Sequence, residues 1–226
     1  MSNKATKQEL TEPDKIQVLL GQIRDYVLTH KRNIAVATTI LLAVFIVIGG
    51  WAYYRQTEET KAMNLYNKAA MDAIRIRMAG QDSAAAVKPL HEVIEKYPST
   101  EAATLAQYRI GNSYLNAGQI DSALKAFQGY LKDKSGENEL TVLVYNGLGN
   151  CYEAKKDYKN ALLQYETALN AKAGKPFAGD ILASLARTYE AMKDNKKAVE
   201  YYQKSMDKTN DPAMKLIIGR KIAILG

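Results

Sequence analysis

One uninterrupted apolar stretch near the N-terminus constrains this chain more than any other feature. From Ile34 to Tyr54 the 21 residues IAVATTILLAVFIVIGGWAYY contain no charged side chain. At a rise of about 1.5 Å per residue, a helix of that length spans about 31 Å, close to the roughly 30 Å hydrocarbon core of a bilayer. A helix in a soluble core would keep some polar face, and this run has none. The sequence therefore predicts a transmembrane helix over residues 34–54.

The residues around this run are typical of a membrane anchor. Trp51, Tyr53 and Tyr54 close the run that Ile34 opens, as aromatic residues do at a lipid–water interface. Basic residues are more numerous before the run than directly after it, where Glu58 and Glu59 follow. The positive-inside rule then places the N-terminus in the cytoplasm and the rest of the chain on the other side of the membrane.

A cleaved signal peptide is the main competing interpretation of this run. The 33 residues that precede it are long for the charged region of a signal peptide, and the run itself is long for a signal core. No small-x-small cleavage site follows it, because Gly49, Gly50 and Ala52 are interrupted and followed by bulky aromatic residues. We therefore expect an uncleaved signal anchor.

The tail before the anchor, residues 1–33, carries apolar residues at helical spacing. Ile16, Leu19, Leu20, Ile23 and Val27 recur on one face, whereas polar residues occupy the other. This pattern predicts an amphipathic helix over about residues 14–30, lying on the cytoplasmic leaflet or against a partner.

Beyond the anchor the chain repeats itself. Three segments align without gaps, starting at Thr104, Val142 and Gly179, which are 38 and 37 residues apart. The matching positions are a small residue (Gly111, Gly149, Ala186), a tyrosine three residues later (Tyr114, Tyr152, Tyr189), an alanine (Ala123, Ala161, Ala198) and an aromatic residue (Phe127, Tyr165, Tyr202). A small residue lets two helices approach closely, and the ring fills the space between repeats. These residues resemble the tetratricopeptide repeat (TPR) family.

The resemblance implies an all-α fold: a transmembrane helix followed by a solenoid of helical hairpins over residues 55–226. One such unit cannot bury its apolar face alone, but stacked units share a continuous core. We expect a degenerate repeat at 57–98, three repeats at about 101–134, 139–173 and 177–209, and a solubilising capping helix at 211–226. The family spacing is shorter than that found here, so extra residues must lengthen a helix or the connections near 133–137 and 173–176.

Residue patterns for catalysis, metal or phosphate binding are missing from the sequence. It has two histidines, one cysteine (Cys151), and no HExxH, CxxC, GxGxxG or P-loop pattern. The net charge of +7 is spread along the chain among acidic residues, whereas a nucleic-acid binder would cluster its basic residues. We expect no enzyme activity, no cofactor, no metal, no nucleic acid and no small-molecule substrate.

A protein-binding surface is what remains. In the TPR family the first helix of each repeat lines a concave groove. On this chain those positions are Leu105, Tyr108, Asn112, Leu115, Leu143, Asn146, Asn150, Glu153, Ala183, Arg187 and Glu190. Asn112 and Asn150 carry groups that could hold a peptide backbone, or could equally bridge neighbouring helices. The chaperone-tail clamp of some TPR domains needs lysines where Tyr108, Asn146 and Ala183 stand, so that function is disfavoured.

The whole layout resembles the YfgM-like ancillary subunits of the bacterial Sec translocon. The matching stretch is roughly residues 14–75, with DKIQVLLGQIRDYVLTHKRN before the run and GGWAYYRQTEETKAMNLYNKA after it. The resemblance implies a single-pass protein of the bacterial inner membrane with periplasmic repeats. Its partners would be SecYEG, a membrane-anchored peptidyl-prolyl isomerase and client polypeptides, and its role would be to aid the transfer of envelope proteins to chaperones.

Two other protein-binding roles fit the same layout. One is a scaffold of another envelope machine, such as outer-membrane assembly; the other is an organelle import receptor with its repeats in the cytosol. A nucleic-acid or lipid-binding module is a further alternative of a different class.

Overall fold

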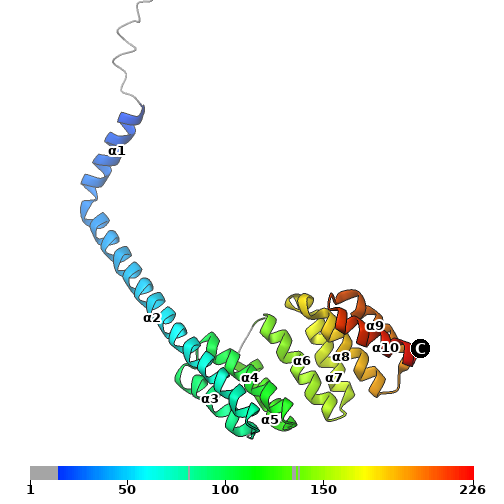
Figure 1. Ribbon diagram of the computed structural model, residues 1–226. Helices are drawn as coiled ribbons and strands as arrows, with labels where there is room; N and C mark the ends of the chain where they lie inside the picture. Colours follow the sequence, from blue (N-terminus) through cyan, green and yellow to red (C-terminus); the bar gives the residue numbers. More distant parts are fainter. Residues whose placement is uncertain (1–14, 81, 134–135, 137) are drawn as a thin grey trace, which may run out of the picture. The chain divides into compact units, whose positions relative to one another are not determined.

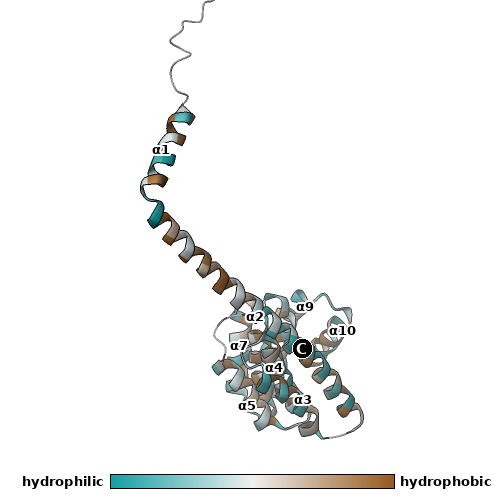
Figure 2. Cartoon of the chain, turned by 90° about the vertical axis from the view of Figure 1, so that its left-hand side faces the viewer, coloured by the Kyte–Doolittle hydropathy of each residue, from teal (hydrophilic) through white to brown (hydrophobic). Residues whose placement is uncertain are grey.

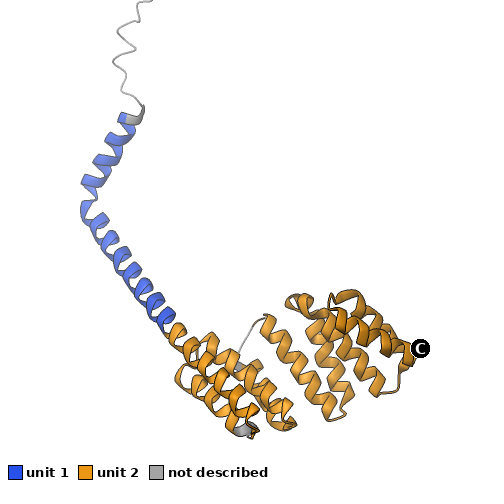
Figure 3. Ribbon diagram, in the orientation of Figure 1, with its two compact units in different colours: residues 1–57 blue, residues 58–226 orange. Residues whose placement is uncertain are grey.

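The protein is described here by a computed structural model, which covers residues 15–80, 82–133, 136 and 138–226. Within these ranges every regular element is a helix and no β-strand occurs, so the predicted all-α fold is confirmed. The first 14 residues of the expected tail, and residues 134, 135 and 137 of the expected long connection, lie outside the described residues. The chain divides into two units, residues 1–57 and 58–226 (Figure 3).

The first unit contains α1 (Lys15–Thr29) and the first half of α2 (Lys31–Met78). Each large apolar side chain from Val36 to Tyr54 is at least 50% exposed, and Figure 2 shows this part of α2 as a mainly hydrophobic helix. Thr38 and Thr39 donate their hydroxyl protons to the carbonyls of Ile34 and Ala35, so their polarity is satisfied inside the helix. By length and composition α2 is able to cross a membrane.

The second unit is a stack of helical hairpins (Figure 1). The end of α2 and α3 (Ser83–Lys96) share one core with α4. The following helices are α4 (Glu101–Asn116), α5 (Ile120–Asp133), α6 (Glu139–Ala154), α7 (Tyr158–Asn170), η1 (Lys172–Phe177), α8 (Ala178–Ala191), α9 (Asn195–Lys208) and α10 (Pro212–Leu225). Each of the helices from α3 to α9 packs against the next α-helix, as expected for a solenoid.

Glycine–aromatic contacts set how closely these helices approach. A Cβ built on Gly111 of α4 would lie 2.5 Å from the Phe127 ring, and one on Gly147 of α6 would lie 2.6 Å from the same ring. Phe127 is fully buried, so it fills the space between the first helices of two hairpins. Gly149 meets Tyr165 in the same manner, because a Cβ built on it would lie 2.3 Å from that ring. The small residues of the repeat are therefore required by the rings.

The turn inside each hairpin has the same geometry three times. Gly118, Lys156 and Lys193 adopt left-handed backbone conformations, with φ values of 73°, 59° and 64°. At each of them two backbone N–H groups donate to carbonyls of the preceding helix, which is the Schellman arrangement. These bonds run from Gln119 to Tyr114, Gly118 to Leu115, Asp157 to Tyr152, Lys156 to Glu153, Asp194 to Tyr189 and Lys193 to Glu190. Two lysines thus hold a conformation that glycine adopts at lower cost.

The start of α4 is held by two side chains from outside the helix. Thr100 caps it by accepting from the N–H of Ala103, at 3.2 Å. The carboxylate of Glu59, on α2, accepts from the N–H groups of Glu101 and Ala102 at 3.0 and 3.1 Å. An anion at a helix N-terminus is favoured by the helix dipole and by the free N–H groups. Glu59 therefore fixes the first full hairpin against α2.

The extra residues between repeats lie in the connections and not inside the hairpins. After α7 the chain forms the short 3-10 helix η1 before α8 begins. At the end of the stack, α10 packs on α9 through Ile218, with Met214 and Ile222 beside it. The exposed side of α10 is mixed: Lys215 and Arg220 are exposed, and Leu216, Ile217 and Ile224 are 59%, 61% and 79% exposed. These residues lie on the part of α10 that α9 does not cover.

Candidate functional site

The first helix of each hairpin carries the residues predicted for the groove. Helices α4, α6 and α8 are neighbours in the stack, in that order. On them, most of the predicted side chains are partly buried, and Arg187 is exposed. The sets are Leu105, Tyr108, Asn112 and Leu115 on α4; Leu143, Asn146, Asn150 and Glu153 on α6; and Ala183, Arg187 and Glu190 on α8.

An ion pair links α6 to α8 on this face. The Arg187 guanidinium donates from Nε and Nη2 to the two carboxylate oxygens of Glu153, at 2.7 and 2.9 Å. It also donates to the amide oxygen of Asn150, at 3.0 Å. The Glu153 side chain is 17% exposed, so this two-point pair is partly withdrawn from solvent.

Tyr165 joins the same network from α7. Its hydroxyl lies 2.8 Å from the amide oxygen of Asn150 and 2.9 Å from a carboxylate oxygen of Glu153. Burial of the ring, followed by the negative charge of Glu153, raises the pKa of Tyr165 far above its usual value. The hydrogen bond to Glu153 raises the pKa of Arg187. The hydroxyl therefore stays protonated and the guanidinium stays charged, as a structural network requires.

The next hairpin repeats the arrangement. Glu190 on α8 accepts from the Tyr202 hydroxyl of α9 at 2.8 Å and from the Lys221 ammonium of α10 at 2.7 Å. Burial acts to raise the pKa of Glu190, but the hydrogen bonds from Lys221 and Tyr202 outweigh it and the pKa falls. Each carboxylate thus ties its own hairpin to the helix that follows it, α8 for Glu153 and α10 for Glu190.

The structure separates the asparagines that the sequence grouped together. Asn150 accepts hydrogen bonds from Tyr165 and Arg187, so it bridges helices and its carbonyl is already occupied. Asn146, one turn earlier on α6, has a buried side-chain oxygen without a hydrogen-bond partner among the described residues. Asn112 lines a pocket instead.

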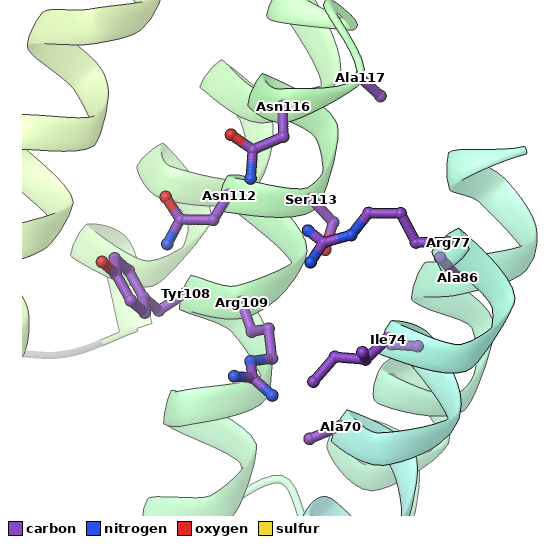
Figure 4. Close-up of a pocket in the computed structure, with 11 residues that line it drawn as sticks. Ala70, Ile74, Arg77, Ala86, Tyr108, Arg109, Asn112, Ser113, Asn116 and Ala117 are labelled. Carbon is purple, nitrogen blue, oxygen red and sulfur yellow. The ribbon is translucent and has the colours of Figure 1, made fainter. Parts of the chain in front are cut away.

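That pocket lies where α4 faces the end of α2. It has a volume of about 370 Å³, and α3 contributes Ala86 to its wall (Figure 4). Tyr108 and Asn112 are the two predicted groove residues that line it. The sequence reasoning missed the others: Ala70, Ala73, Ile74, Arg77, Ala86, Arg109, Ser113, Asn116 and Ala117. The degenerate repeat at 57–98 indicated that the end of α2 packs as the first helix of a hairpin. No motif in that repeat indicated which of its residues would face α4.

Comparison with known families supports the interpretation of these stacked hairpins. The model of the tetratricopeptide repeat-like domain matches residues 26–225. This chain belongs to that family. The TPR resemblance found from the repeated small and aromatic residues is therefore confirmed, whereas the narrower Sec-subunit resemblance is not tested by this match.

Solved structures share the TPR-like fold of this chain at low identity. PilF of Pseudomonas aeruginosa is 20% identical, with a TM-score of 0.57 over 73% of this chain and 69% of PilF. BtubC from P. vanneervenii is 15% identical, with a TM-score of 0.60 over 76% and 82% of the two chains. MamA is 16% identical, with a TM-score of 0.53 over 68% and 81%. No curated protein matches the chain significantly.

The lone cysteine of this TPR-like domain belongs to the core. Cys151 is fully buried beside Phe127, Tyr130 and Leu148, and burial raises the pKa of its thiol to about 12. A thiol with that pKa is a poor nucleophile near neutral pH. A TPR-like fold of this kind is typical of a non-enzymatic interaction scaffold.

Proposed function

We propose that this chain is a membrane-anchored TPR scaffold that binds other proteins. The observation that carries the proposal is the composition of α2. This one helix contains the apolar run 34–54, whose large side chains from Val36 onward are at least 50% exposed, and ends as the first helix of the hairpin stack. Twelve large apolar side chains in water would be unfavourable, and lipid is the solvent that removes this cost. The Arg55 guanidinium, 5.5 Å from the centroid of the Trp51 ring, suits the polar edge of such a span.

The partner-binding surface in this proposal is the face formed by α4, α6 and α8. The Glu153 and Glu190 networks hold the first helices in place, so a partner meets a surface that is already ordered. Pre-organisation lowers the entropic cost of binding. Anchoring adds a second advantage, because it confines the surface close to the membrane and raises its effective concentration for segments that emerge there.

The finer proposal is an accessory role at the bacterial Sec translocon. The support is the resemblance of residues 14–75 to the YfgM-like subunits: an amphipathic helix, one span ending in Gly-Trp-x-Tyr, and degenerate repeats. In this account the N-terminus is cytoplasmic and the repeats are periplasmic. SecYEG and a membrane-anchored peptidyl-prolyl isomerase meet the α1–α2 region, and client polypeptides meet the repeats on their way to chaperones.

Crosslinking in the native membrane tests the partners. A photoreactive amino acid is placed at Leu20 and Phe45, which are 59% and 64% exposed in the first unit, and at Arg187 on the groove face. The same label at Lys204, on the exposed surface of α9, serves as the matched control. Capture of Sec components from Leu20 or Phe45, but not from Lys204, supports the proposal. Capture of outer-membrane assembly proteins alone would instead support the rival envelope scaffold.

Cysteine accessibility tests the orientation. Because Cys151 is fully buried, a single cysteine introduced at the exposed Lys208 gives a clean signal in intact cells. A membrane-impermeant maleimide should label this variant once the outer membrane is permeabilised, and should not label a cysteine at Asn3 until the inner membrane is broken. The reverse pattern would contradict periplasmic repeats and favour an import receptor. A mature chain starting after residue 54 would exclude the anchor.

A further inference from the structure

The pocket between α2 and α4 differs in charge from the rest of the groove face. On the groove face of α6 and α8 two carboxylates are matched to cations: Glu153 to Arg187, and Glu190 to Lys221 of α10. At the α2–α4 pocket two arginines, Arg77 and Arg109, line the wall, and none of the described residues that line it is Asp or Glu. Neither arginine forms an ion pair with a described residue.

The two cations approach the pocket from opposite sides. Figure 4 shows the Arg77 side chain reaching from α2 across the pocket toward Ser113, whereas Arg109 extends from α4 toward the level of Ile74 and Ala70. The Arg109 guanidinium lies 5.9 Å from the centroid of the Tyr66 ring, a cation–π contact that limits where this side chain can move. A negative group entering from solvent would therefore meet two positive charges, one of which is already positioned.

Apolar and amide groups complete the wall. Ala70, Ala73 and Ala86 are small residues that leave room, and Ile74 is 39% exposed beside them. Asn112 and Asn116 carry both a donor and an acceptor, which suits the N–H and C=O groups of an extended peptide. A volume of about 370 Å³ lies at the low end of the range for ligand pockets. This space suits an anchoring side chain and its flanking backbone.

We propose that this pocket binds an acidic segment of a partner protein. In the complex Arg77 and Arg109 pair with Asp or Glu carboxylates, an aliphatic side chain of the segment packs on Ile74 and the alanines, and Asn112 binds its backbone. Arginine is the cation best suited to carboxylates, because its planar fork makes two parallel hydrogen bonds. This inference rests on the proposed role of the domain as a protein-binding scaffold, and it names the chemistry of the segment that the scaffold selects.

Peptide binding to the whole chain tests the proposal. The protein is placed in nanodiscs of phosphatidylcholine, so that no anionic lipid competes. The probe is a fluorescein-labelled peptide, GSELEDLEGS, and its neutral counterpart is GSQLQNLQGS, which keeps the size and the leucines. Fluorescence anisotropy should show the acidic peptide binding at least about tenfold more tightly, with the difference shrinking as salt rises. Equal binding of the two peptides would overturn the proposal.

A double variant, Arg77→Gln with Arg109→Gln, identifies the site. It should weaken binding of the acidic peptide by about tenfold or more and leave the neutral peptide unchanged. The matched control is Arg75→Gln, an arginine on the same helix that pairs with Asp72 and does not line the pocket. If the double variant melts early, Arg77→Gln alone is used, because Arg77 is exposed. An equal loss in Arg75→Gln would overturn the assignment of the site.

Two further readouts separate this inference from its alternatives. If the double variant loses affinity for phosphatidylglycerol vesicles while the acidic peptide binds it normally, the arginines serve lipid and the proposal is wrong. If the peptide does not bind but crosslinking still captures membrane partners through Leu20 or Phe45, the scaffold role stands and only this inference fails.

Discussion

Glu153 and Glu190, 37 residues apart, accept hydrogen bonds from the same two kinds of partner. Each carboxylate accepts from a tyrosine on the second helix of its own hairpin and from a cation on the helix that follows that hairpin. Arg187 donates twice to Glu153, and Lys221 donates once to Glu190. The polar contact therefore repeats with the fold. In the first full hairpin the equivalent positions are Leu115 and Phe127, which pack in an apolar cluster instead. The same positions of the repeat thus make polar contacts in two hairpins and apolar contacts in the first full hairpin.

The Glu153–Arg187 pair should show measurable coupling between neighbouring hairpins. A double-mutant cycle with Glu153→Gln and Arg187→Gln is expected to give about 1–2 kcal/mol of interaction free energy, because the pair is two-pointed and partly buried. Urea unfolding followed by circular dichroism supplies the four free energies of unfolding. The control cycle uses Glu200 and Lys204, an exposed pair within α9, and should give about 0.5 kcal/mol or less. Equal coupling in the two cycles would show that the inter-hairpin pair stabilises the fold no more than an exposed surface pair.

Gly149 should be intolerant of a methyl group. Gly149→Ala places a Cβ 2.3 Å from the Tyr165 ring, which is fully buried and cannot move aside freely. The free energy of unfolding should fall by about 1–3 kcal/mol, as expected for overpacking. Gly219→Ala is the matched control, since the α10 position has nothing within 4 Å of the added Cβ. This variant should gain about 0.5–1 kcal/mol from helix propensity. A loss in both variants of similar size would refute the close-packing explanation.

The lysines in the hairpin turns offer a stabilising change. Lys156→Gly and Lys193→Gly remove a side chain from φ values of 59° and 64°, where an L-residue is strained. Relief of about 1–2 kcal/mol is partly offset by the greater freedom of glycine in the unfolded chain, so each variant should gain up to about 1 kcal/mol. Thermal melting measures the gain. Lys125→Gly, at an exposed position inside α5, is the control and should lose about 1 kcal/mol. A loss in the turn variants would mean that the lysine side chains make a contact worth more than the strain.

Sequence reasoning was strongest where a feature depends on local pattern. The spacing of Gly111, Gly149 and Ala186 predicted close helix contacts, because small residues and rings must alternate in a stack. The fate of Asn112 and Asn150 could not be predicted in that way. The two residues are equivalent in the repeat, but Asn150 accepts from the hydroxyl of Tyr165 and the guanidinium of Arg187. In the hairpin of Asn112, the residue equivalent to Tyr165 is Phe127, which has no hydroxyl. Their roles depend on side chains from other helices.

The same limit explains the missed pocket residues. Arg77 and Arg109 are 32 positions apart and share no motif, so only the packing of α2 on α4 brings them to one pocket. The composition of the exposed side of α10 depends on packing in the same way. Lys221 turns to Glu190, whereas Lys215 and Arg220 stay exposed beside two isoleucines and a leucine.

Cys151 should make the stability of the domain fall at alkaline pH. Burial raises the pKa of the thiol to about 12 in the folded state, above its ordinary value in the unfolded chain. The folded state therefore holds the proton more tightly, and this contribution is complete below the unfolded pKa and is lost as the pH rises toward 12. Between pH 7 and pH 10 the wild type should lose about 1–2 kcal/mol more free energy of unfolding than Cys151→Ala. The burial of Tyr165 and Tyr202 raises their pKa values too, but these residues are present in both proteins, so the difference between the two pH profiles isolates the thiol. Parallel profiles for the two proteins would show that the thiol titrates equally in the folded and unfolded states, against its burial between α5 and α6.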